Sequence, residues 1–350
     1  MKTTKYLFKN KTKLFGMLLI ILCFCYLPAC GSNRPAPAMA YTGENYLQAP
    51  EKIEYDRSQL DAIPHNLQPA LSVPTYVTKV DDIYFIVDCY NNQVIYNDNM
   101  TAPLQEWNIM TGDVTMAHTL ASDGTVYLID DTENHRILVM EKDVTSNGEI
   151  IFVPTQRFSN IGNRPHYIIY DEYTDTFYAW SSQSGEMYLF RRKADTTEVY
   201  LTEIRNIPSL NGVYARSFTI IEDRIYFVSG NSTIIEADLD TFEIKKEYPV
   251  PAEMSGMIQI TPIENYYYIT ISTDVTGNQD YATMIRVKDL DDLAKGNYED
   301  VYSHFIGGGT PYYITRIDDI WYLTEHRLPG HSIWSFQIID DQITNVQAIY

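Results

Sequence analysis

The sequence contains little cysteine, and this scarcity excludes a disulfide framework. Only 4 of its 350 residues are cysteines, and they are Cys23, Cys25, Cys30 and Cys89. Basic residues are scarce too, with 26 Lys and Arg against 46 Asp and Glu and a formal net charge of −20. Nucleic-acid binders rely on basic side chains to neutralise phosphates. The composition therefore argues against that class and predicts no nucleic-acid partner.

Long helical periodicity and several catalytic signatures are also missing. The sequence has no GxSxG, HExxH or CxxC motif and no phosphate-binding P-loop, so nothing in it points to those enzyme classes. Aromatic residues, by contrast, are plentiful, with 29 Tyr, 13 Phe and 4 Trp. A disordered chain holds far fewer. We therefore expect a folded protein that is stabilised by burial of apolar side chains.

The N-terminus has the three parts of an export signal. Five lysines between Lys2 and Lys13 precede an uncharged, mostly apolar stretch, Leu14–Leu27. This stretch is shorter than the roughly 18–20 residues that a membrane-spanning helix needs. The following Leu27-Pro28-Ala29-Cys30 resembles a bacterial lipobox, although Pro28 departs from the residue type usual there. The resemblance implies that residues 1–29 are a cleaved signal peptide and that Cys30 becomes an acylated N-terminus, with palmitate among its chains.

The predicted anchor sets the location and the surroundings of the protein. Two or more acyl chains on Cys30 attach a protein stably to a bilayer, here on the extracytoplasmic face of the cell membrane. Residues 30–51 are rich in Gly, Ser, Pro and Ala and are predicted to form a flexible tether. Without residues 1–29 the net charge becomes −25, so anionic headgroups should repel the folded domain. Cys89 would then be the one cysteine beside Cys30.

The rest of the chain repeats one pattern six times. An acidic or Asn turn opens each copy, a β-rich strand with an aromatic residue follows, and a polar turn leads to a second strand. The aromatic residues recur every 41 to 54 residues, at Tyr84, Tyr127, Tyr178, Tyr226, Tyr267 and Trp321. This spacing is typical of a four-stranded propeller blade. A single blade cannot cover both of its faces, whereas a closed ring of blades can. The predicted fold is an all-β, six-bladed β-propeller of four-stranded antiparallel blades over residues 52–350.

Two of the copies carry a family resemblance. Gly124–Glu141 resembles an NHL repeat, and Val87–Asp98 is a looser version. The resemblance implies an NHL-like six-bladed propeller, a fold that commonly closes by placing an N-terminal strand in the last blade. Ile53–Tyr55 could supply that strand, or Ile343–Tyr350 could complete the sixth blade unaided.

Some residues that look functional are interpreted as structural. Asn134-His135-Arg136 has the composition of a hairpin turn. Asp289–Gly296 is acidic but lacks the oxygen ligand and the glycine that a calcium loop places at its fifth and sixth positions. We expect a short helical insertion there.

The candidate site is the rim of the central channel, where the innermost strands of all blades begin. Alignment of these strand starts places one variable residue per blade at the rim: Thr75, His118, His166, Arg216, Met257 and Tyr312. Arg216 would bind a carboxylate or phosphate through two hydrogen bonds, and His118 and His166 would add further bonds. Tyr312 and Tyr76 would supply stacking surface. The alternative is that these groups satisfy one another around channel water.

The predicted function is binding or scaffolding by a membrane-anchored lipoprotein, with a small molecule, glycan, peptide or partner protein at the rim. No catalytic residue, metal ligand or cofactor is assigned. The alternative from another class is a metal-dependent lyase or hydrolase at the channel mouth, to which His118 and His166 could contribute ligands, although the sequence offers no convincing third ligand. A third reading is a structural lipoprotein of an envelope complex.

Overall fold

The computed structural model describes residues 38–56, 63–305, 309–326 and 332–350. The chain divides into two units, Met1–Asn33 and Arg34–Tyr350, and all described residues belong to the second. The predicted signal peptide and Cys30 lie outside the described residues. Among the residues described, no helix has the length and apolarity needed to span a membrane.

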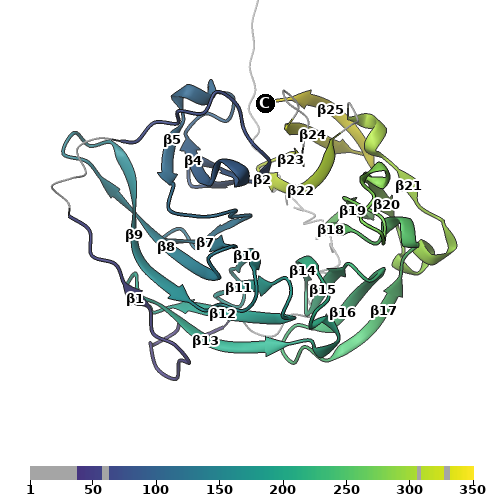
Figure 1. Cartoon of the computed structure of the whole chain (residues 1–350), viewed down its shortest axis with the longest axis horizontal. Helices are drawn as coiled ribbons and strands as arrows, with labels where there is room; N and C mark the ends of the chain where they lie inside the picture. The colour runs from purple at the N-terminus through teal and green to yellow at the C-terminus, as the bar shows by residue number, and fades with distance from the viewer. Residues whose placement is uncertain (1–37, 57–62, 306–308, 327–331) are drawn as a thin grey trace, which may run out of the picture. The chain divides into compact units, whose positions relative to one another are not determined.

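Six antiparallel sheets of four consecutive strands form a ring (Figure 1). Blade 1 consists of β2 (Pro74–Val80), β3 (Ile83–Asp88), β4 (Gln93–Asn97) and β5 (Asn108–Thr111). Blade 2 consists of β6 (Leu120–Ser122), β7 (Val126–Asp131), β8 (Arg136–Val144) and β9 (Ile150–Ser159). Blade 3 consists of β10 (Pro165–Asp171), β11 (Thr176–Ser181), β12 (Glu186–Arg192) and β13 (Val199–Asn206). Blade 4 consists of β14 (Ala215–Ile221), β15 (Arg224–Ser229), β16 (Thr233–Asp238) and β17 (Ile244–Pro249). Blade 5 consists of β18 (Met257–Ile263), β19 (Tyr266–Ile271), β20 (Thr283–Val287) and β21 (Glu299–Asp300). Blade 6 consists of β22 (Thr310–Ile317), β23 (Ile320–His326), β24 (Ile333–Ile339) and β25 (Gln342–Ala348).

The predicted six-bladed propeller is therefore confirmed. Every aromatic residue of the repeat lies in the second strand of its blade, from Tyr84 in β3 to Trp321 in β23. Short 3₁₀ helices occur in the connections: η2 (Cys89–Asn91), η3 (Leu104–Glu106), η4 (Pro208–Leu210), η5 (Ala252–Met254), η6 (Gln279–Tyr281), η7 (Leu290–Lys295) and η8 (Tyr302–His304). The helical insertion expected at Asp289–Gly296 is confirmed as η7, which Asp289 caps through its side chain.

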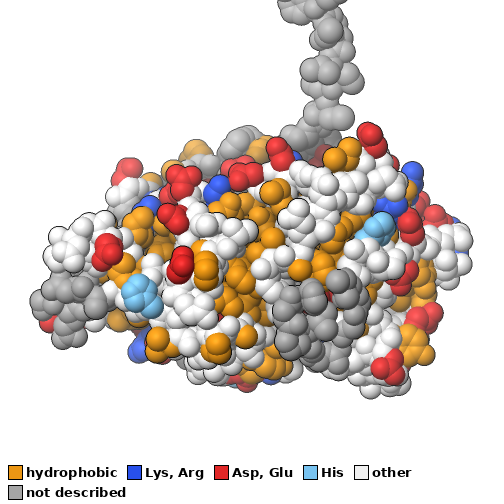
Figure 2. All heavy atoms as spheres, turned by 90° about the horizontal axis from the view of Figure 1, so that it is seen from above, with side chains coloured by type: hydrophobic (Ala, Val, Ile, Leu, Met, Phe, Trp, Pro, Cys, Tyr) orange, Lys and Arg blue, Asp and Glu red, His pale blue; other side chains and the backbone are white. Residues whose placement is uncertain are grey.

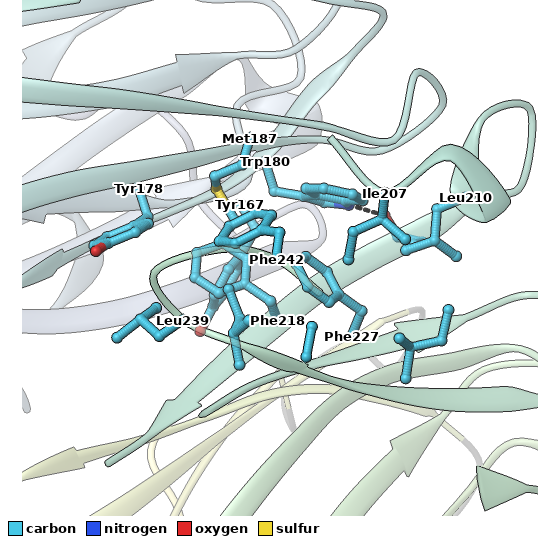
Figure 3. Close-up of a cluster of buried hydrophobic side chains, with 14 of the residues drawn as sticks. Tyr167, Tyr178, Trp180, Met187, Ile207, Leu210, Phe218, Phe227, Leu239 and Phe242 are labelled. Carbon is cyan, nitrogen blue, oxygen red and sulfur yellow. Dashed lines mark hydrogen bonds between the residues drawn. The ribbon is translucent and has the colours of Figure 1, made fainter. Parts of the chain in front are cut away.

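The hydrophobic core lies between the blades. Of the six clusters of buried apolar side chains, five each draw on two neighbouring blades, and the one between blades 3 and 4 also reaches Ile258, Tyr312 and Tyr313 around the channel. In the cluster between blades 3 and 4 (Figure 3), the ring centroids of Trp180 and Phe227 are 4.6 Å apart, and Trp180 Nε1 donates to the carbonyl of Ala215 at 2.9 Å. Each blade thus covers the apolar face of the next, which is what the repeat predicts.

Blade 6 closes on blade 1 through side chains and without an exchanged strand. The fourth strand of blade 6 is β25, from the C-terminal stretch. Tyr350 continues from it to blade 1, where Trp107 Nε1 donates to the Tyr350 hydroxyl at 2.9 Å, and that hydroxyl donates to the carbonyl of Met100 at 2.8 Å. Of the two closing strands that the sequence left open, Ile53–Tyr55 is the wrong one, because this segment lies beside blade 2.

The described N-terminal segment begins beside the β10–β11 hairpin of blade 3 and then runs along the outer strands of blades 3 and 2. Ala38 N donates to Tyr173 O at 3.1 Å and Leu47 N to Leu201 O at 2.8 Å. Strand β1 (Glu51–Lys52) then pairs with β9 as a fifth strand of that sheet. Residues 38–51, which the sequence placed in a flexible tether, are therefore bound to the propeller through backbone hydrogen bonds.

A closed ring of six hydrogen bonds joins the blades around the channel. In each blade one buried side chain donates to a backbone carbonyl at the start of the next blade's innermost strand. The six bonds are Thr75 Oγ1 to His118 O (2.8 Å), Thr132 Oγ1 to Pro165 O (2.7 Å), His166 Nδ1 to Arg216 O (3.1 Å), Ser217 Oγ to Ile258 O (2.5 Å), Thr270 Oγ1 to Tyr312 O (2.6 Å) and Thr324 Oγ1 to Thr75 O (2.7 Å). The last bond joins blade 6 to blade 1. Buried carbonyls need such partners, so the ring fixes the blades where the site lies.

Replacement of Thr324 tests this closing bond. The Thr324→Val change keeps the side-chain shape but removes the donor to Thr75 O and the acceptor for Tyr313 N. We expect the free energy of unfolding, measured in urea by Trp fluorescence, to fall by about 2 kcal/mol, because buried polar groups lose their partners. The control is Thr125→Val, at an exposed hairpin position. Equal free energies of unfolding for the two variants would contradict a stabilising role of the Thr324 hydrogen bonds in the ring.

Candidate functional site

One end of the channel opens into a small polar cavity. Its volume is about 170 Å³. It is lined by Tyr90, Met116, His118, Arg164, Tyr214, Arg216, Ser272, Thr273, Gln279, Thr310, Tyr312 and His326. These residues come from all six blades and lie at the end where the innermost strands begin.

Irregular strand pairing directs the rim side chains. In five blades the register of the innermost strand shifts within its first residues, and the residues at the shift have no paired partner on the second strand. In four of these blades one residue is left unpaired: Thr75, His166, Arg216 or Ile258. In blade 6 two residues are left unpaired, Tyr312 and Tyr313. A bulge of this kind re-aims a side chain out of the sheet's regular alternation. In blade 5 the displaced residue is Ile258, so the aligned position is one residue later than Met257, which packs between blades 4 and 5.

In blade 2 the buried carboxyl group of Asp130 replaces the strand partner. Asp130 accepts from the backbone N–H groups of His118 (2.7 Å) and Thr119 (2.9 Å), and from the Thr119 hydroxyl (2.6 Å). Burial raises the pKa of Asp130 to about 8, against the lowering effect of these donors. Asp130 therefore holds His118 at the rim where the sheet pairing has not yet begun.

The structure brings three of the six predicted residues to the cavity. His118, Arg216 and Tyr312 line it. Thr75 and His166 are fully buried and belong to the hydrogen-bond ring. Tyr76 does not line the cavity; its ring contacts Tyr313 edge-on at 6.1 Å.

Aromatic side chains close the channel beneath the cavity. Tyr313 packs against Tyr312, with ring centroids 4.5 Å apart. Tyr313 also meets Tyr167 at 4.9 Å, although these residues come from blades 6 and 3, on opposite sides of the ring. Gln259 Nε2 donates to the Tyr167 hydroxyl at 3.3 Å. Because these side chains meet across the axis, they form a floor, and the cavity opens at one end.

The two histidines form a buried, stacked pair whose hydrogen bonds define their tautomers. The rings of His118 and His166 lie 3.7 Å apart. Thr132 Oγ1 uses its hydrogen on Pro165 O, so it must accept from His118 Nδ1, at 2.9 Å. His166 Nδ1 donates to Arg216 O, and its Nε2 then accepts from the Tyr214 hydroxyl at 2.9 Å. On His118, Nε2 faces the buried Cys89 thiol at 3.9 Å.

Both histidines are neutral at physiological pH. Burial lowers the pKa of His118 to about 3, and the nearby side chains of Arg164, His326 and Arg216 lower this pKa further. Burial likewise places the pKa of His166 well below its ordinary value, with His118 and Arg216 adding to the effect. The permanent positive charge at the cavity therefore comes from the two arginines.

Arg216 and Arg164 differ in how far the protein satisfies them. The Arg216 guanidinium lies over the Tyr214 ring, 4.6 Å from its centroid, and makes a 3.5 Å contact to Met257 O. Arg164 pairs with Glu133 at 2.7 Å, yet its buried Nε has no hydrogen-bond partner in the described part of the chain. Among the cavity's lining residues there is no Asp or Glu, whereas acidic side chains outnumber basic ones on the outer wall in Figure 2.

Several lining residues were not predicted from the sequence, above all Arg164, Tyr90, Tyr214 and His326. Arg164 stands directly before Pro165, the first residue of an aligned strand start, so extending the alignment by one residue would have included it. Tyr214 precedes Ala215 in the same way. Tyr90 follows the second strand of blade 1, and His326 is the last residue of the second strand of blade 6. Both strands reach the same end of the channel. His326 stacks on Tyr312, with ring centroids 5.2 Å apart.

The described residues contain no group of three or more His, Cys, Asp or Glu side chains arranged to hold a metal ion. His135, interpreted as structural, adopts a positive φ of 49° in its turn, and its Nδ1 accepts from Arg164 N at 3.0 Å. It thus supports the segment that carries a cavity arginine.

Solved structures share this architecture across most of their length. A "putative 6-phosphogluconolactonase" from Bacteroides fragilis aligns over 90% of this chain and 94% of its own, with 13% identity and a TM-score of 0.54. A second, from Bacteroides uniformis, has 12% identity and a TM-score of 0.52 over 88% and 93% of the two chains. Streptogramin B lyase has 14% identity and a TM-score of 0.50 over 81% and 85%. The chain is a six-bladed β-propeller.

These similarities establish the fold alone, because the identities are low. No protein-family model matches the sequence, and no curated protein matches it significantly. The likeness of Gly124–Glu141 to an NHL repeat therefore stays a prediction, as does the lipobox.

Because the two histidines are buried in their neutral form, we expect the protein to lose free energy of unfolding as the pH falls. His118 is neutral in the folded protein down to pH about 3, whereas in the unfolded chain it binds a proton below about 6.5. The folded state therefore loses relative stability as the pH falls below 6.5, by about 2 kcal/mol per such histidine at pH 5. We expect His118→Gln to lose less stability than the wild type between pH 7.5 and pH 5 in urea unfolding. The exposed His65→Gln serves as control; a wild-type-like pH dependence in His118→Gln would refute this reading.

Proposed function

We propose that the protein is a membrane-anchored extracytoplasmic lipoprotein whose propeller binds a small anionic ligand, or the anionic group of a larger one, in the cavity at the channel mouth. The observation that carries the proposal is the pair of arginines in a cavity without carboxylates, in a chain with 20 more acidic than basic residues. Such a site attracts anions that the rest of the surface repels.

The geometry supports a carboxylate or a phosphate as the recognised group. A guanidinium presents donors in a planar fork that matches both groups. Arg216 is available for this contact, since its bond to Met257 O is long, and Arg164 adds a second positive charge to the cavity lining. Stacked Tyr312 and His326 provide a flat surface beside the two arginines, suited to a ring or a planar group of the ligand.

Rigidity also favours binding. The cavity rests on the floor of Tyr313 and Tyr167 and is surrounded by the hydrogen-bond ring, so its side chains are held before a ligand arrives. Binding then requires little ordering of the protein, which lowers the entropic cost of association. His118 and His166 stabilise this arrangement as neutral groups, so in this proposal the hydrogen bonds to the ligand come from the arginines and tyrosines.

Anion titration of the purified protein tests the cavity. The probes are inorganic phosphate, citrate and glucose 6-phosphate, with glucose as the uncharged comparison, followed by calorimetry. We expect at least one anion to bind and Arg216→Ala to weaken that binding 10-fold or more, because a charge-assisted contact is lost. Arg216→Lys should recover only part of it, since an ammonium lacks the planar fork.

The matched control for this titration is Arg157→Ala. Arg157 pairs with Glu51 on the outer edge of blade 2 and should leave anion affinity unchanged. If every anion binds Arg216→Ala and the wild type equally, or if none of the three binds the wild type, the cavity is not an anion site of this kind.

The anchor has its own test. Cells that express the protein are labelled with a palmitate analogue and separated into membrane and soluble fractions. We expect the wild type to be labelled and membrane-bound, and Cys30→Ser to lose both properties. The control is Cys89→Ser, because Cys89 is buried and should not be acylated. Unlabelled wild-type protein, or labelled Cys30→Ser, would refute the lipidation at Cys30.

A further inference from the structure

The described N-terminal segment begins at the end of the propeller opposite to the cavity. The innermost strands start at the cavity and run away from it, so the hairpin between β10 and β11 lies at the far end. Ala38 is bonded to Tyr173, in that hairpin. Arg191 Nη2 donates to Met39 O at 2.6 Å, and Ala194 N donates to Tyr41 O at 2.9 Å. The chain is thus fixed to the end without the cavity.

The chain length between this point and the predicted anchor is short. Cys30 precedes Ala38 by eight residues. Eight residues span at most about 28 Å when fully extended, and about 16 Å on average as a flexible chain. Strand β10 has 7 residues, so the two ends of the propeller are separated by roughly 20 Å or more.

We infer that the end of the propeller that carries Tyr173 faces the bilayer and that the cavity opens away from it. This inference rests on the proposed acylation of Cys30. With the cavity against the bilayer, Ala38 would stand roughly 20 Å or more above the headgroups, and the eight residues would have to be almost fully stretched. The orientation proposed here needs no such stretching.

This orientation limits the sources from which an anion can reach the cavity. Carboxylates and phosphates reach an outward-facing cavity from the extracytoplasmic space or from cell-surface polymers, whereas headgroups of the protein's own membrane do not. The bilayer-facing end also carries acidic residues in its inner hairpins, such as Asp82, Glu222 and Asp319. Anionic headgroups repel this end, so it faces the bilayer without lying flat against it.

Fluorescence quenching by lipid headgroups tests the orientation. The acylated full chain is reconstituted in phosphatidylcholine vesicles whose headgroups carry a quencher, and one thiol-reactive dye is placed at either end. Asn211→Cys labels the cavity end, between β13 and β14, and Asp319→Cys labels the opposite end, between β22 and β23; both positions are exposed. Cys89 is buried and takes no dye. We expect the dye at position 319 to be quenched at least twofold more than the dye at 211.

The outcomes separate this inference from the anchor. Equal quenching of the two dyes, or stronger quenching at 211, overturns the orientation and leaves the anchor standing. Quenching of neither dye, with the same result when Cys30→Ser is added, overturns the anchor and the orientation together. The anion titration with Arg216→Ala is independent of both, since it is done without a membrane.

Discussion

Closure of the ring is the constraint on which the rest of the structure depends. Each blade has two apolar faces and covers neither by itself, so stability requires that blade 6 meet blade 1. Trp107 and Tyr350 join these blades on the outside, and Thr324 joins them at the channel through the carbonyl of Thr75. The last of these contacts belongs to a circle of six hydrogen bonds that satisfies a buried carbonyl in every blade. A defect at one position therefore affects the geometry at the channel mouth as well as the stability of the seam.

The same circle explains how a cationic cavity persists in an acidic protein. Two guanidinium groups at one small opening repel each other, and the neighbouring histidines would add to that repulsion if they were charged. Burial keeps the histidines neutral, and their hydrogen bonds to Thr132, Arg216 O and Tyr214 fix each ring. The cation–π contact with Tyr214 and the ion pair with Glu133 stabilise the arginines in part. An anion would supply the remaining stabilisation, which is the physical basis of the proposed binding.

The sequence predicted the fold far better than the site. Anchors such as Tyr127 and Tyr178 recur at regular intervals because each blade is a local unit, and local units leave a regular pattern. Residues of the rim do not follow such a pattern. Met257 was aligned one residue too early because a bulge in β18, invisible in the alternation, displaces Ile258 instead. His166 was read as a ligand group because nothing local shows that Arg216, 50 residues later, presents a carbonyl to it.

The number of blades and the antiparallel sheets were determined by the sequence itself, because strand alternation, turn residues and repeat length are encoded within each stretch of about 50 residues. The tertiary structure decided which polar groups remain available to a ligand. Tyr167 and Tyr313 seal the channel only because blades 3 and 6 lie opposite each other, and Arg164 joins Arg216 only because neighbouring blades bring their rims together. Such contacts between distant parts of the chain are set by the angle and register of packed blades, which no local pattern specifies.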